Sequence, residues 1–82
     1  MTQLYVIEVK KNINDEFEHN VNWVWDEDPT KARLKGESKY HEILASAAIS
    51  NMKEHSAILF TSEGFPLMHN CYKHDLVAST EE

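Results

Sequence analysis

The chain has 82 residues, of which 41% are hydrophobic and 27% charged, which is the composition of one globular domain and excludes wholesale disorder. Its single cysteine excludes an intramolecular disulfide and any zinc site built from several cysteines. The formal net charge of −6 disfavours direct binding to nucleic acid unless the few cations gather on one surface.

Two β-strands are predicted at the start of the chain. Residues 3–10 are rich in β-forming side chains that alternate between two faces, and a second strand is predicted over roughly 19–25. The polar residues 12–18 connect them. The two strands are therefore expected to pair as a hairpin with a long loop.

The second strand contains both tryptophans of the chain. Trp23 and Trp25 lie two residues apart, so a regular strand points both toward the same face as Val21. In the commoner arrangement, both rings pack beneath a helix at the centre of the core. In the other, Val24 faces the core and the tryptophans face outward as anchors for a partner. The sequence leaves both interpretations open.

A helix-start signal follows this strand, because the Asp-Pro pair at 28–29 combines a capping carboxylate with a proline that the first helical turn tolerates. A short turn over 29–35 is expected to end at Gly36, a residue that suits a left-handed C-terminal position. The main helix is then predicted over 38–54, with Ser38 as its cap and with a broad apolar face.

The last third of the chain predicts a second hairpin. Residues 57–61 read as a strand, and 65–69 as its return after a tight turn. Pro66 cannot donate to a ladder, which indicates that this strand lies at a sheet edge or starts late. A further short strand near 76–77 and a frayed tail over 79–82 complete the prediction.

The element order β-β-α-β-β predicts one α+β domain over residues 1–82. Its architecture is a small antiparallel sheet of about four strands with one helix packed on one face. The other face must be solvated or covered by something else, and both a monomer and a homodimer remain open.

Acidic side chains crowd the second strand and its flanks. Between residues 12 and 28 there are six acids and no Lys or Arg. Beside an exposed aromatic ring, such a surface is typical of a face that binds a basic protein, although a solvated loop with a helix cap is the plainer interpretation. The predicted partner-binding residues are Trp25 and an acidic ridge made of Asp26, Glu27, Asp28, Asp15, Glu16 and Glu18.

Two further clusters support weaker hypotheses. A basic patch suggests, as the alternative function, a small RNA- or nucleotide-binding domain. Its members are Lys31, Arg33, Lys35 and Lys39, with Tyr40 nearby. The second cluster consists of borderline metal ligands whose spacing matches no zinc signature. These are His69, Cys71 and His74.

No catalytic residue, metal or cofactor is predicted. The run 26–28 lacks the alternating oxygen ligands and central glycine of a calcium loop, and His41, on the apolar helix face, is expected to be a buried structural histidine. Phosphate-binding and hydrolase motifs are absent, and two glycines cannot build a glycine-rich phosphate loop. We therefore expect a protein without enzymatic activity.

A cytoplasmic location is expected, because Glu8 interrupts the first apolar run too early for a secretory signal and no run approaches the length of a membrane span.

The opening sequence Tyr5-Val6-Ile7-Glu8-Val9-Lys10-Lys11-Asn12-Ile13-Asn14, together with the size, acidity and element order, resembles the small phage-encoded inhibitors of the anti-CRISPR type. The resemblance implies an inhibitor that acts in the cytoplasm of the host cell. Its partner would be a Cas protein or CRISPR effector complex, with the acidic ridge in a basic channel where it blocks DNA or guide engagement. The resemblance covers the architecture of the chain and assigns no role to an individual residue.

Overall fold

The computed structural model describes residues 1–74. The strand predicted near 76–77 and the tail predicted over 79–82 lie outside this range. The predicted element order is confirmed, with four strands and one helix. They are β1 (Thr2–Lys11), β2 (Phe17–Asp26), α1 (Pro29–Ala48), β3 (Glu54–Thr61) and β4 (Pro66–Lys73).

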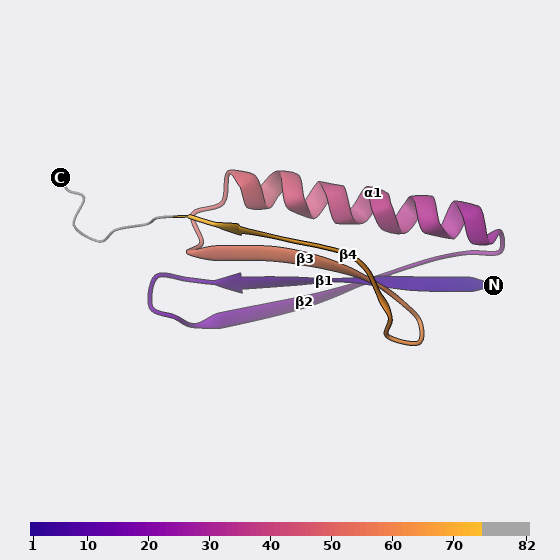
Figure 1. Ribbon diagram of the computed structural model, residues 1–82, viewed down its shortest axis with the longest axis horizontal. Helices are drawn as coiled ribbons and strands as arrows, with labels where there is room; N and C mark the ends of the chain where they lie inside the picture. Colours follow the sequence, from indigo (N-terminus) through magenta and orange to yellow (C-terminus); the bar gives the residue numbers. More distant parts are fainter. Residues whose placement is uncertain (75–82) are drawn as a thin grey trace.

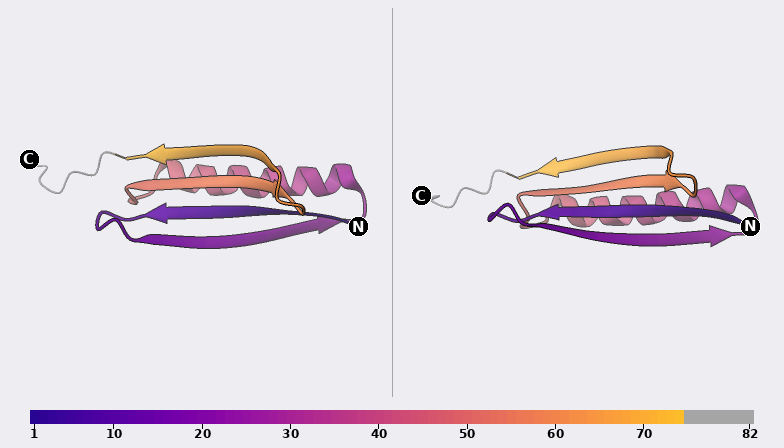
Figure 2. Two further views of the ribbon diagram at one scale, coloured as in Figure 1. Left: turned by 60° about the horizontal axis from the view of Figure 1, so that its bottom comes forward. Right: turned by 90° about the horizontal axis from the view of Figure 1, so that it is seen from below.

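The four strands form one antiparallel sheet in the order β2-β1-β3-β4, and α1 runs along the strands on one face of it (Figure 1). The predicted α+β class is therefore confirmed. β2 and β4 are the two edge strands (Figure 2). The edge position indicated by Pro66 is correct, and the ladder shifts register beside it, between Leu59 and Phe60.

The core lies between the sheet and α1, where alternate residues of the central strands meet the helix. Leu4 and Val6 of β1 and Ala57 and Leu59 of β3 are buried on this face. The helix contributes apolar residues that lie along one of its faces. These are Ala32, Tyr40, Ile43, Leu44 and Ala47.

The helix begins where the sequence predicts. Asp28 is its N-cap and accepts a hydrogen bond from the Thr30 N–H at 2.9 Å, and Pro29 occupies the first turn. Its C-terminal end differs from the prediction, because α1 ends at Ala48 and Ile49 is 88% exposed. The predicted extension to residue 54 is wrong, since the chain must turn back there to begin β3.

Gly36 does not end a helical turn. It lies inside a continuous α1, buried against the sheet. A Cβ atom added at this position would lie 3.0 Å from Leu59 Cδ1 and 3.6 Å from Val24 Cγ2. The glycine thus allows close approach of helix and sheet, and the predicted break with a new helix starting at Ser38 is wrong.

All four strands differ in extent from the predictions because strand pairing overrides local polarity. β1 pairs with β2 as far as Lys11 opposite Phe17, and with β3 as far as Lys11 opposite Glu54. Polar residues at the strand ends therefore join the ladder. The connection between β1 and β2 shrinks accordingly to residues 12–16.

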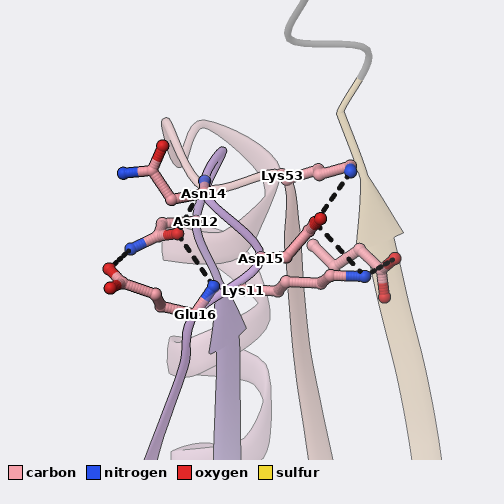
Figure 3. A network of polar contacts seen from close by, with 7 residues as sticks. Lys11, Asn12, Asn14, Asp15, Glu16 and Lys53 are labelled. Atoms are coloured by element: carbon pink, nitrogen blue, oxygen red, sulfur yellow. Dashed lines mark hydrogen bonds and ion pairs between the residues drawn. The ribbon is translucent and has the colours of Figure 1, made fainter.

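This short connection is held by its own side chains (Figure 3). The Asn12 side-chain oxygen accepts hydrogen bonds from the backbone N–H groups of Asn14, at 2.8 Å, and Glu16, at 3.0 Å. Asp15 sits in the left-handed region, with φ 64°, a conformation that Asp and Asn tolerate better than most residues.

Candidate functional site

The two tryptophans face away from the helix. Leu4 pairs with Val24, so Val24 shares the helix-side face of the sheet and packs against the core. Trp23 and Trp25 therefore point to the opposite face, where they are 58% and 54% exposed. The outward-facing interpretation is correct for this chain, and the commoner arrangement, with both rings in the core, is wrong.

Aromatic rings cross three strands on this side of the sheet. Tyr5 lies between Trp23, at a ring-centroid distance of 4.8 Å, and Phe60, at 5.0 Å. We call the sheet surface opposite α1 the open face. Its large side chains come from β1, β2 and β3: Tyr5, Ile7, Val9, Phe17, Val21, Trp23, Trp25, Ile58 and Phe60.

The open face carries charge at one end only. Strand alternation brings Lys11, Glu54 and Lys73 to it, and these three residues form a single row across β1, β3 and β4. The rest of this face, up to the Trp25 end, is built from apolar residues, aromatic residues and uncharged polar groups. Among residues 1–74, no helix or strand covers it.

The Trp25 end of the open face adjoins an acidic corner, which consists of Asp26, Glu27 and Asp28. Lys35 of α1 contacts two residues at this place. Its ammonium group lies 3.0 Å from Asp26 Oδ2 and donates a hydrogen bond to the Trp25 carbonyl oxygen at 3.2 Å. The same ammonium lies 5.8 Å from the centroid of the Trp25 ring, a cation–π distance. Trp25 is thus held in place next to the acids.

Within this corner the acids have different surroundings. The Asp28 backbone N–H donates to Asp26 at 2.9 Å, and this bond and then the Lys35 contact lower the pKa of the Asp26 carboxyl below its usual value. Asp28 caps the helix, and Glu27 is exposed. The corner thus places three acidic side chains beside an exposed aromatic ring.

The other predicted acids lie at the far end of β2. Asp15 and Glu16 occupy the β1–β2 connection and Glu18 the start of β2, so most of the length of β2 separates this group from the acidic corner. At about 3.3 Å per residue, that distance is about 30 Å. The structure therefore forms two separate acidic groups, and the single continuous ridge expected from the sequence is not formed.

Within this second group, the charge of Asp15 is balanced by two lysines. Its carboxylate lies 2.9 Å from Lys53 Nζ and 3.6 Å from Lys11 Nζ (Figure 3). These contacts tie the β1–β2 connection to the start of β3. Asp15 has a structural role in this arrangement, and the acidic corner is the stronger candidate for contact with a partner.

The Asp15–Lys53 contact predicts a pH-dependent contribution to stability. The hydrogen bond and charge of Lys53 lower the pKa of the Asp15 carboxyl, and the same contact raises the pKa of the Lys53 ammonium. Because the pKa of the Asp15 carboxyl is lower in the folded state, its stabilisation of the fold is present above the carboxyl pKa of the unfolded state and is lost as the pH falls through that of the folded state. Because the pKa of the Lys53 ammonium is higher in the folded state, its stabilisation is present below the ammonium pKa of the unfolded state and is lost as the pH rises through that of the folded state. The contact therefore stabilises between about pH 4 and about pH 10.

We expect Asp15→Asn to flatten the acid side of the melting-temperature profile between about pH 5 and pH 2. Asparagine keeps the left-handed conformation and removes only the charge. Thermal melts followed by circular dichroism measure this, with Glu18→Gln as a control that removes an exposed carboxylate elsewhere on the same end of the sheet. An unchanged acid limb for Asp15→Asn would contradict the assignment.

The predicted basic patch does not form a free cationic surface with an aromatic ring. Arg33 pairs with Glu37 at 2.7 Å, and Lys39 pairs with Glu42 at 3.2 Å. Tyr40 is buried in the core and offers no ring for stacking on a base.

Of the histidines singled out in the sequence, His41 is placed differently from the prediction. His41 is exposed on α1, so its expected burial on the apolar helix face is wrong. The ring of His74 bonds to the Ala47 carbonyl oxygen at 2.7 Å, while His69 and Cys71 share the open face of β4. Among the described residues, no three His, Cys, Asp or Glu side chains gather as a metal site would require.

One buried polar pair is not predicted by the sequence analysis. His55 is buried in β3, and its Nε2 lies 2.5 Å from the Glu8 carboxylate, while its Nδ1 has no hydrogen-bond partner among the described residues. The available signal was the alternation of β3, which places His55 on the same face as Ala57 and Leu59.

Comparison with protein-family models, with curated proteins and with solved structures finds no match for this chain. Within residues 1–74, no helix combines the length and apolar character that a membrane span requires.

Proposed function

We propose that this protein is a non-enzymatic protein-binding domain, an inhibitor or adaptor, that docks through the open face and the acidic corner on a partner with a basic surface. The observation that carries the proposal is the pair of half-exposed tryptophans on a sheet face that is uncharged beside them. Large exposed apolar surfaces are rare on soluble monomers and mark sites of interaction.

The free energy available from burial of the two tryptophans indicates that most of the open face contacts the partner. Covering the exposed halves of Trp23 and Trp25 removes about 100–130 Å² of each ring from water, which contributes about 3 kcal/mol per ring. The sum, about 6 kcal/mol, is of the same order as the entropic cost of association. The tryptophans would therefore anchor a complex that needs the neighbouring apolar residues for useful affinity.

The acidic corner supplies the preference for a basic partner. Asp26, Glu27 and Asp28 lie at the Trp25 end, and long-range attraction to a cationic surface speeds encounter. The ring then slows dissociation, because tryptophan is the residue most enriched among binding hot spots.

A CRISPR effector is the specific partner that we propose, on the resemblance in size, acidity and element order. Such effectors hold their guide–target duplex in a positively charged channel, which is the surface that an acidic corner fits. Target-DNA cleavage by purified effectors, with and without a molar excess of this protein, tests the specific partner. Full cleavage by every effector tested would reject a CRISPR effector as the partner. The general proposal of a basic protein partner would still be tested by the affinity capture described next.

The general proposal is tested by affinity capture from nuclease-treated host lysate, followed by binding kinetics with the purified partner. We expect Trp25→Ala to speed dissociation by about 30-fold, which corresponds to a hot spot of about 2 kcal/mol. We expect the triple variant Asp26→Asn/Glu27→Gln/Asp28→Asn to slow association at least about tenfold at 50 mM salt, and less at 300 mM. The asparagine at position 28 keeps the helix cap.

The chain offers a matched control for this triple variant. Asp15→Asn/Glu16→Gln/Glu18→Gln removes the same number of charges at the other end of β2. Association that slows equally for both triples would indicate an effect of net charge alone and would reject the acidic corner. If Trp25→Ala and both triple variants bind the partner as the wild type does, the open face is also rejected as the binding surface.

A further inference from the structure

The two edges of the sheet differ in how they are protected against pairing. β4 begins at Pro66, shifts register beside it and carries Lys73, and each of these features discourages the addition of another strand. β2 has ten residues in unbroken register with β1 and contains no proline, no lysine and no bulge. Of the two edges of the sheet within residues 1–74, only the β2 edge is therefore suited to accept a further strand.

We propose that the β2 edge pairs with the β2 edge of a second copy of this chain, antiparallel and about a two-fold axis. Among residues 1–74, no strand lies outside β2, and Figure 2 shows it along the margin of the sheet. The product is a continuous sheet of eight strands, with both helices on one side and both open faces on the other. This inference does not rest on the proposed function.

The side chains of β2 select the register. Opposed residues in an antiparallel ladder share a face, so a two-fold axis must pass beside one residue of β2 that faces itself. When that residue is Val21, Trp23 lies opposite His19 of the second copy, and Trp25 lies opposite Phe17 of the second copy. Cross-strand aromatic pairs of this kind stabilise antiparallel sheets.

The same register suits the other face of β2. It places Asn20 opposite Asn22, whose amides can bond to each other, and Glu18 opposite the apolar Val24. A register centred on Asn22 would instead set Glu18 opposite Asp26 twice, and like charges directly opposite destabilise a ladder. Of these two registers, β2 therefore favours the one centred on Val21.

Sedimentation velocity over 5–200 µM, with the full chain, tests the dimer. We expect the wild type to change from the 9.5 kDa monomer to twice that mass within this range. Val21→Lys should remain monomeric throughout, because two lysines would meet on the axis, and a half-exposed side chain tolerates the change in the folded monomer. A wild type that stays monomeric at 200 µM would overturn the proposal.

His69→Lys is the matched control, since it adds the same charge to the same open face on the opposite edge strand. We expect it to dimerise like the wild type. Loss of the dimer in both variants would indicate that two copies stack through their open faces, which would reject the edge pairing.

Disulfide trapping gives a readout that does not depend on a destabilising charge. In a Cys71→Ser background, Val21→Cys should cross-link on mild oxidation, because side chains that face each other on the axis have Cβ atoms about 5 Å apart. Asn22→Cys should not cross-link, since in this register residue 22 lies opposite residue 20 of the second copy and the two cysteines do not face each other. Cross-linking at position 22 but not 21 would reject the Val21-centred register, and none at either position would reject the pairing.

Discussion

Replacement of Gly36 by valine is expected to lower the free energy of unfolding by about 3 kcal/mol. A Cβ atom at this position already meets Leu59 Cδ1 at 3.0 Å, and it lies 3.7 Å from Leu4 Cβ. Valine adds two further methyl groups where no space is left, so helix and sheet must move apart. Urea denaturation followed by circular dichroism at 222 nm measures the loss.

Two comparisons make this result specific. Ser38→Val, at an exposed position of the same helix, should cost less than about 1 kcal/mol, because only helix propensity changes there. Gly36→Ala should fall between the wild type and Gly36→Val, since about 1 kcal/mol of helix propensity offsets part of the crowding. Equal stabilities for Gly36→Val and Ser38→Val would contradict the close approach of α1 to the sheet.

Truncation of Leu59 to alanine is the second large effect, with an expected loss of about 2–5 kcal/mol. Leu59 is fully buried on β3, a central strand, and faces α1 at the point where Gly36 approaches. The cost combines the lost transfer of the side chain from water with the cavity left behind. Chemical denaturation with both urea and guanidinium chloride gives the free energy of unfolding.

Ile58→Ala is the control for this truncation, because Ile58 is the next residue of the same strand and faces the open face. We expect a smaller loss there, since the side chain is only half-buried. Equal losses at the two positions would mean that both faces of the sheet are packed alike, contrary to the structure.

The two effects are coupled through one contact. Leu59→Ala removes the atom that a Cβ at Gly36 would strike. We therefore expect Gly36→Ala to be more favourable in the Leu59→Ala background than in the wild type, by about 0.5–2 kcal/mol. Additive effects in the double-mutant cycle would show that the crowding arises elsewhere.

The fold was largely predictable because its signals are local. The alternation in β1, the short β-forming run in β3, the Asp-Pro helix start and the edge position of Pro66 each depend on neighbours in the sequence. The helix interruption at Gly36 was predicted wrongly for the same reason. A glycine that ends a helix and one that admits a close neighbour look alike until the sheet beneath it is known.

The candidate site was predictable only in part. The sequence alone indicated that Trp23 and Trp25 share a face and that six acids surround β2. Which face they share depended on the register with β1, which sets Val24 beside Leu4, because a shift of one residue would have exchanged the two faces. Likewise, the acids form two groups because β2 is fully extended between them.

By itself, the sequence determined the element types, their order and the excess of negative charge, since these follow from the composition and periodicity of short segments. Tertiary structure alone decided that the tryptophans are exposed, that Lys35 holds Trp25 beside the acidic corner, and that Lys53 neutralises Asp15. Those outcomes depend on strand register and on contacts between distant segments. They follow from the way α1 and the four strands fill the space between them, which no local pattern specifies.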